Sequence, residues 1–200
     1  MSALSLGSSE IHGGRVLRSI LFICAVAAGT MADATETDIS VSAEIDGAAV
    51  RIEASALIRA PLEIMWQTLT DYDHLDKFIP GMTRSRVVDR RGVAAIVEEV
   101  GEARFLFLSY PISVTVSSEE YPPYSIRVHA LNGNLRKLEG GYQIVPRDGG
   151  EIELTWKGLI EPDSDLPMLI TKPVLRAVVE TQFRGMVAEI RRRSLPHGAR

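Results

Sequence analysis

The chain has 200 residues, of which 46% are hydrophobic and 24% are charged, and its formal net charge is -4. This composition is that of an ordinary globular protein with one domain, large enough to bury a core without disulfide or metal staples. The negative charge excludes the strongly basic surface of nucleic-acid-binding proteins, so no nucleic acid is expected among the partners.

The beginning of the chain has the pattern of a secretory signal peptide. Arg15 and Arg18 precede an apolar stretch at residues 19–29, and small residues suited to cleavage follow at 30–34. An apolar core of about ten residues is too short to span a membrane, which takes about 20. We therefore expect an exported, periplasmic protein. A membrane anchor or a buried helix is the alternative interpretation of this segment.

Three parts of the chain are predicted: a cleaved signal peptide at residues 1–34, a polar lead-in segment at 35–48, and a single domain at 49–195. Cys24 is the only cysteine and lies within the signal peptide. The mature protein is therefore expected to have no disulfide, no thiol nucleophile and no cysteine-based metal site.

The sequence offers no motif for catalysis. His74, His129 and His197 are far apart in the chain and do not have the spacing of metal ligands on one helix. No Gly-x-Ser-x-Gly nucleophile elbow occurs. We therefore predict no catalytic residue, no metal site and no cofactor.

The domain is predicted to begin with a strand at residues 50–59, where apolar and polar residues alternate, followed by two short helices at 62–70 and 74–79. Six further strands with turn residues between them follow. They are predicted at residues 84–89, 94–103, 105–116, 125–131, 138–145 and 151–160. Pro111 predicts a break or an edge within its strand, because proline cannot donate a ladder hydrogen bond. The short turns predict antiparallel pairing.

A long amphipathic helix is predicted at residues 173–194, with Pro173 in its first turn. Its apolar face consists of Leu175, Val178, Val179, Phe183, Met186, Val187 and Ile190. Its charged face consists of Arg176, Glu180, Arg184, Glu189 and Arg191. A helix of about twenty residues is roughly 30 Å long and needs a sheet to cover its apolar face. The predicted class is therefore α+β, with an antiparallel sheet packed on this helix.

Small residues recur at strand positions that are predicted to face inward. These residues are Ala54, Ala56, Gly101, Ala103, Gly140 and Gly158. Two interpretations are open. The small residues either leave a cavity between sheet and helix or simply allow the sheet to curl.

Two further features have a functional and a structural interpretation. Glu99 shares its strand face with Val97 and Gly101, so it is either a polar contact for a ligand or a residue at a wet strand end. Residues 166–170 are apolar without an evident partner. They are either buried on two sides or form a portal that touches a membrane or a donor protein.

The segment 60–81 carries a family resemblance. It contains Ala60-Pro61, Trp66, Asp71-Tyr72 and Pro80-Gly81, and it resembles the opening of the START-like helix-grip superfamily. The nearest branch is the polyketide cyclase/dehydrase and coenzyme Q-binding START-domain group. Three later segments are similar as well, and the likeness covers roughly residues 43–193. The later segments are 101–105, 156–158 and 182–190.

The resemblance implies a curved antiparallel sheet that grips the C-terminal helix and encloses an apolar tunnel. Members of the superfamily bind lipids, quinones, sterols or polyketides, and a few catalyse cyclisation. Our first hypothesis is therefore an exported protein that holds a hydrophobic small molecule, with transient membrane contact as a further expectation. The predicted ligand-binding residues are Glu99, Phe105, Phe107, Tyr142, Trp156, Leu175, Val179, Phe183 and Met186.

Two other hypotheses belong to different classes. The first is a cyclase/aromatase or dehydrase-type enzyme in which Tyr142, Thr115 or Glu99 positions an enol and moves a proton. Export argues against it, because polyketide substrates are normally tethered inside the cell. The second is an interaction domain with a filled core, which the absence of a cavity would favour.

Overall fold

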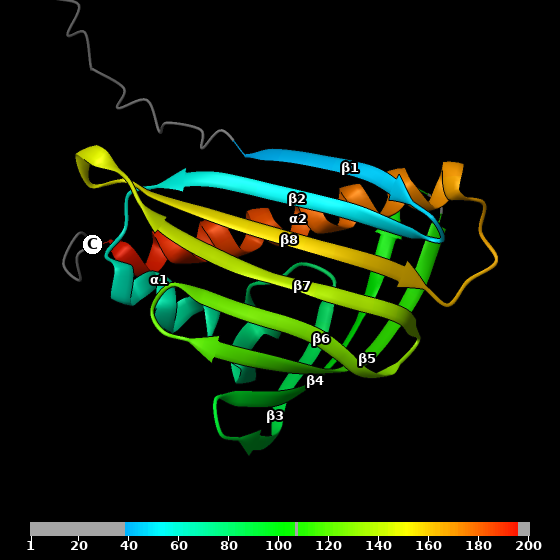
Figure 1. Cartoon of the computed structure of the whole chain (residues 1–200), viewed down its shortest axis with the longest axis horizontal. Helices are drawn as coiled ribbons and strands as arrows, with labels where there is room; N and C mark the ends of the chain where they lie inside the picture. Colours follow the sequence, from blue (N-terminus) through cyan, green and yellow to red (C-terminus); the bar gives the residue numbers. More distant parts are fainter. Residues whose placement is uncertain (1–38, 107, 196–200) are drawn as a thin grey trace, which may run out of the picture. The chain divides into compact units, whose positions relative to one another are not determined.

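The computed structural model describes residues 39–106 and 108–195. Eight antiparallel strands form one sheet in the order β1-β2-β8-β7-β6-β5-β4-β3 (Figure 1). The strands are β1 (Ser40–Asp46), β2 (Ala49–Ile58), β3 (Met82–Arg91), β4 (Ala94–Phe105), β5 (Leu108–Tyr121), β6 (Ser125–Gly133), β7 (Leu135–Pro146) and β8 (Ile152–Pro162). The helices are α1 (Leu62–Leu69), the 3-10 helices η1 (Tyr72–Lys77) and η2 (Asp148–Gly150), and α2 (Met168–Ser194). The predicted α+β helix-grip class is confirmed.

The sheet curves around α2. In Figure 1 this helix runs behind β2 and β8. It contacts β1 and β2 near one edge of the sheet and also β4 near the other edge, although four strands separate β2 from β4. A flat sheet could not bring both groups of strands to one helix, so the curvature creates the enclosed inner face on which a site can lie.

The segment that composition suggests as a polar lead-in contains the edge strand β1. Residues of β1 pair with β2 over its whole length, from Ser40 opposite Ser55 to Asp46 opposite Ala49. Only Val41 and Ala43 pack against the core, while the other side chains face solvent. This is typical of an edge strand, whose polar composition hides its strand character from a search for apolar alternation.

The prediction of a single strand at residues 105–116 is wrong. β4 extends to Phe105 and β5 begins at Leu108, so a tight hairpin turn containing Leu106 lies between them. β5 then continues through Pro111 without a break. Pairing with β6 starts only at Val114, so the proline nitrogen faces a free edge where no ladder hydrogen bond is lost.

Helix α2 begins at Met168, five residues before the predicted start, and Pro173 lies inside it. Thr171 is buried in the extra turn, and its hydroxyl lies 3.1 Å from the Leu166 carbonyl oxygen. Leu169 and Ile170 are 87% and 41% exposed. The structural interpretation that the apolar run 166–170 is buried on two sides is therefore wrong.

The C-terminal half of α2 is fastened to η1 by an ion-pair network. Glu189, predicted on the solvent face, is instead buried, and its carboxylate contacts Arg192 and Arg193 at 2.7 Å each. Arg193 also contacts Asp71 at 2.8 Å, and Asp71 contacts His74 at 2.7 Å. Hydrogen bonds from Arg192 and then Arg193 lower the pKa of Glu189 to about 2, against the effect of burial. The prediction failed because α1 and the segment that contains Phe78 and Pro80 also pack against α2, so the helix is covered on more than its apolar face.

Candidate ligand-binding cavity

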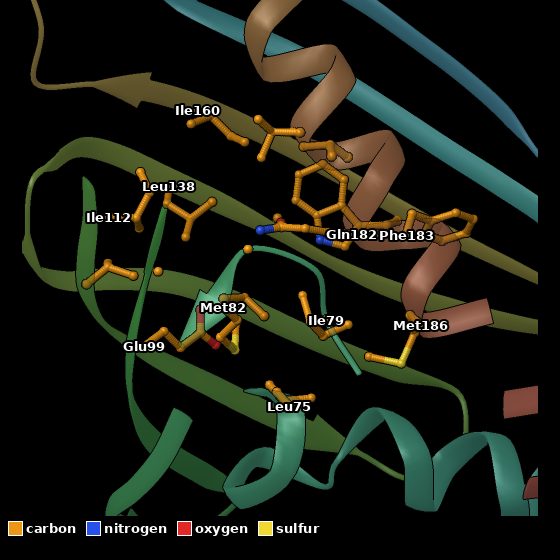
Figure 2. Close-up of a pocket in the computed structure, with 18 of the residues that line it drawn as sticks. Leu75, Ile79, Met82, Glu99, Ile112, Leu138, Ile160, Gln182, Phe183 and Met186 are labelled. Carbon is orange, nitrogen blue, oxygen red and sulfur yellow. The ribbon is translucent and has the colours of Figure 1, made fainter. Parts of the chain in front are cut away.

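An apolar cavity of about 220 Å³ lies between α2, the inner face of the sheet and the segment around η1. Figure 2 shows side chains from all three parts pointing into it, among them Leu75 and Ile79 near η1, Leu138 from β7, and Phe183 and Met186 from α2. Each part contributes because sheet curvature leaves more room under the strands than the helix fills.

The structure places seven of the nine predicted ligand-binding residues on the wall of this cavity. They are Glu99, Tyr142, Trp156, Leu175, Val179, Phe183 and Met186. Phe105 is not among the lining residues, because it is the last residue of β4 and lies beyond the cavity end. Phe107 lies outside the described residues. Contact of any of the nine with a ligand stays a prediction.

Two of the inward-facing glycines line the cavity and also allow neighbouring strands to approach closely. Gly101 and Gly140 line the cavity. A Cβ atom at either would meet backbone within 2.5 Å, at the Gly81 carbonyl oxygen and at the Lys157 carbonyl oxygen respectively, so glycine permits the close strand approach. Gly158 does not line the cavity, because the ring of Trp156 lies over it, with its nearest carbon 2.3 Å from where a Cβ would be.

Two carboxyl side chains, Glu99 and Glu102, line the cavity, and only Glu99 has no charged partner within the described residues. Its neighbours Glu98 and Glu102 pair with Arg86 and Arg104 respectively, whereas no ion pair or hydrogen bond joins Glu99 to a described residue. Burial alone raises the pKa of the Glu99 carboxyl to about 7. The side chain therefore lies in the cavity as a group that is largely uncharged below neutral pH.

Two tyrosines lie near this carboxyl. Burial raises the pKa of Tyr142, and the negative charge of Glu99 raises it further. Burial likewise raises the pKa of Tyr72, with smaller additions from Glu120 and Glu99. The Tyr72 hydroxyl lies beside Ser118, yet it has no hydrogen-bond partner of acceptable geometry among the described residues.

Sequence reasoning missed the lining residues near η1 and on β5. Tyr72, Leu75 and Met82 come from a segment that the sequence marks only as short helix and turn. Val114 and Ser118 are four residues apart on β5 and therefore lie on the same face of the strand. This spacing was the sequence signal that could have placed them together. That signal could not be used without the register, which sets Val114 directly opposite Glu99.

The chemistry of the cavity is mainly that of apolar burial. Its polar side chains are two tyrosines, one serine, one glutamine and two carboxyls, and its described residues include no lysine, arginine or histidine. A carboxyl that titrates near pH 7, as Glu99 does, is able to exchange a proton with a ligand. Thr115, the third residue of the enzyme hypothesis, pairs with outward-facing Glu98 and does not line the cavity.

Along the described part of the chain, no set of three or more potential ligand side chains is placed to hold a metal ion. Within the same residues, no helix has the length and apolar character needed to cross a membrane.

A curved antiparallel sheet that grips a long C-terminal helix around an apolar cavity defines a START-like helix-grip domain. The model of the family "polyketide cyclase / dehydrase and lipid transport" matches residues 49–194, and the chain belongs to this family. No curated protein matches the chain.

Solved structures with the same fold come from several organisms. The aromatase/cyclase ZhuI of Streptomyces sp. R1128 has a TM-score of 0.64 at 15% identity, covering 75% of this chain and 98% of its own. A STAR-related lipid transfer protein of Xanthomonas axonopodis has a TM-score of 0.62 at 13% identity, covering 76% and 93%. A START superfamily protein of Mycobacterium smegmatis has a TM-score of 0.61 at 14% identity, covering 71% and 97%. At these identities the likeness shows the fold alone.

Proposed function

We propose that the protein is an exported carrier that holds one hydrophobic small molecule, such as a single-chain lipid or a quinone, in the cavity beneath α2. The observation that carries this proposal is the cavity itself, whose wall is apolar apart from a few polar side chains. Burial of apolar ligand surface would supply the affinity, at about 25 cal/mol per Å² before the costs of association. The family to which the chain belongs includes lipid transport.

The size of the cavity supports a small cargo. A volume of about 220 Å³ lies below the roughly 300–1,000 Å³ of pockets that take drug-sized ligands. A single acyl chain or a small ring system fits this space better than a phospholipid with two chains. Export is proposed from the signal-peptide pattern at residues 1–34, which lies outside the described residues.

The test is native mass spectrometry of the full chain, expressed with its own N-terminus and purified from the envelope fraction, followed by organic extraction. We expect one apolar molecule per chain. A ligand-free mass, together with no uptake of added apolar compounds, would contradict the proposal. If an added compound is instead released with a changed mass, the result favours the enzyme hypothesis.

We also propose transient membrane contact at the end of the domain where α2 begins. Leu169 and Leu106 are 87% and 85% exposed. The two regions that carry them are close, because the Tyr110 hydroxyl near the β4–β5 turn lies 3.0 Å from the carbonyl oxygen of Asp163 in the segment before α2. Leu175 of α2 and Ile112 of β5 line the cavity, and we propose that the exposed leucines mark the end at which a ligand enters.

The variant Leu169→Glu should slow the uptake of a fluorescent fatty alcohol from phosphatidylcholine vesicles by about tenfold or more, because an inserted leucine side chain gains about 1.5–3 kcal/mol from burial that a carboxylate cannot. Stopped-flow fluorescence measures the rate. The matched control is Val93→Glu, which changes a 57% exposed residue in the distant β3–β4 turn. Equal rates for both variants would contradict membrane contact at α2.

A further inference from the structure

Five polar side chains gather at one place on the cavity wall or directly behind it. Glu99 on β4, Tyr142 on β7, Tyr72 on η1 and Ser118 on β5 line the cavity. Ser85 on β3 lies directly opposite Glu99 in the strand register, and cross-strand partners share one face of a sheet. These five residues form what we call the polar pole of an otherwise apolar cavity.

The hydrogen-bonding capacity of the polar pole is not used up within the described residues. The hydroxyls of Tyr72 and Ser85 are buried, with residue exposures of 5% each. Neither makes a hydrogen bond of acceptable geometry to a described residue, although the Ser118 side chain lies beside the Tyr72 hydroxyl. An unmade hydrogen bond costs a buried group about 1–3 kcal/mol, so native proteins rarely leave two such groups together without a use for them. Glu99 adds a carboxyl that points toward the cavity (Figure 2).

The polar pole contains an acidic side chain and no basic one. No lysine, arginine or histidine is among the described residues of the cavity wall, and the only unpaired carboxyl that could meet a ligand head is that of Glu99. A carboxylate or phosphate head would enter as a buried anion without a counter-ion and next to a second acid, which is strongly unfavourable. An uncharged hydroxyl avoids this cost and both donates and accepts hydrogen bonds.

We propose that the polar pole binds the uncharged hydroxyl head of the ligand and that the cavity rejects the corresponding anion. This inference rests on the proposed function, since it names the chemistry of the molecule that the cavity holds. The Tyr72 hydroxyl and the Glu99 carboxyl each make a hydrogen bond to the head, while the apolar tail lies against α2. An alkylammonium head binds more weakly than the hydroxyl, because its charge would lose its hydration and would face a single carboxyl that is largely uncharged below neutral pH.

The test uses the full chain, freed of bound lipid, and four ten-carbon probes that differ only in the head: decane, 1-decanol, decanoate and decylamine. Displacement of the uncharged fluorophore N-phenyl-1-naphthylamine gives each dissociation constant at pH 6 and pH 8, below the concentration at which the probes aggregate. We expect 1-decanol to bind about tenfold or more tightly than decanoate and more tightly than decylamine. Decane reports on the apolar cavity alone.

Two variants separate a ligand contact from a structural role. Tyr72→Phe and Glu99→Leu should each reduce the preference for 1-decanol over decane by about fivefold or more, while decane still binds. Glu99→Gln keeps an uncharged group that donates and accepts, so it should retain 1-decanol binding at both pH values. The matched control is Glu98→Gln, which changes the neighbouring residue on the outer face of β4, where it pairs with Arg86. This control should leave all four constants unchanged.

The experiment distinguishes a failure of the proposed carrier function from a failure of the inference about the ligand head. If none of the four probes binds, the carrier function itself is wrong. If decane and the others bind but decanoate or decylamine equals or exceeds 1-decanol, the carrier function stands and the inference about the head is overturned. The inference is also overturned if Tyr72→Phe and Glu99→Leu both leave the ratio of 1-decanol to decane unchanged.

Discussion

The double variant Val179→Trp with Phe183→Trp should lose about 100-fold in affinity for an apolar probe such as 1-decanol while remaining folded. Both residues lie on the face of α2 that lines the cavity, with exposures of 8% and 2%. The added ring atoms would occupy part of the 220 Å³ that the ligand needs. Excluding about 100 Å² of ligand surface removes about 2.5 kcal/mol of binding free energy at about 25 cal/mol per Å².

The fold should tolerate this change because the new side-chain volume enters an existing cavity rather than a filled core. Overpacking elsewhere typically costs about 1–3 kcal/mol, and circular dichroism with urea denaturation reports whether the variant is folded. Thr181→Trp adds a comparable ring on the solvent side of the same helix and should bind the probe normally. A folded double variant with unchanged affinity would show that the ligand does not occupy this cavity.

Replacing Glu99 by glutamine should stabilise the protein at pH 8 by about 2 kcal/mol and leave its stability near pH 4.5 almost unchanged. The pKa of Glu99 is raised from 4.5 to about 7 by burial in the cavity. A pKa difference of this size between the folded and the unfolded chain corresponds to about 3 kcal/mol. Glu99 is only partly buried by surface area, so solvent screening reduces this figure to about 2 kcal/mol.

The direction follows from proton binding in the two states. Below pH 4.5 Glu99 is protonated in both the folded and the unfolded chain and contributes nothing to the pH dependence. Between pH 4.5 and about 7 the unfolded chain releases this proton while the folded chain keeps it. The free energy of unfolding therefore falls as pH rises through this window and levels off above it. Glutamine has no proton to release, so the variant lacks this decline.

Urea denaturation at pH 4.5, 6 and 8 measures the effect as a change in midpoint. Glu98→Gln is the matched control, because Glu98 lies on the outer face of the same strand and pairs with Arg86 at 2.9 Å. Glu189, whose pKa is lowered to about 2, is present in all of these proteins and cancels in the comparison. Identical pH profiles for the wild type and Glu99→Gln would show that Glu99 is not desolvated in the folded protein.

Much of the fold was predictable from local patterns. The strand at residues 50–59, the first short helix and the last strand were predicted to within one or two residues of β2, α1 and β8. The errors have physical causes. β1 is a polar edge strand, the β4–β5 turn lies within a continuously apolar run, and the first turn of α2 precedes a proline that normally marks a helix start.

The candidate site was predictable only in part. The α2 residues Leu175, Val179, Phe183 and Met186 could be found because helical spacing fixes which side chains share a face. Tyr72 could not, because its place on the cavity wall depends on how η1 packs under a sheet whose strands are distant in sequence.

The order of elements, the antiparallel pairing and the apolar face of the long helix follow from the sequence alone, and the resemblance adds the helix-grip fold. Periodicity and short turns are local properties of the chain, so no distant contact is needed to find them. Two environments became visible only in three dimensions: Glu189 is buried beside Arg192 and Arg193, and Glu99 shares a cavity wall with Tyr72, Tyr142 and Ser118. Those environments depend on the strand register and the curvature of the sheet, which are set by pairings between residues far apart in the chain.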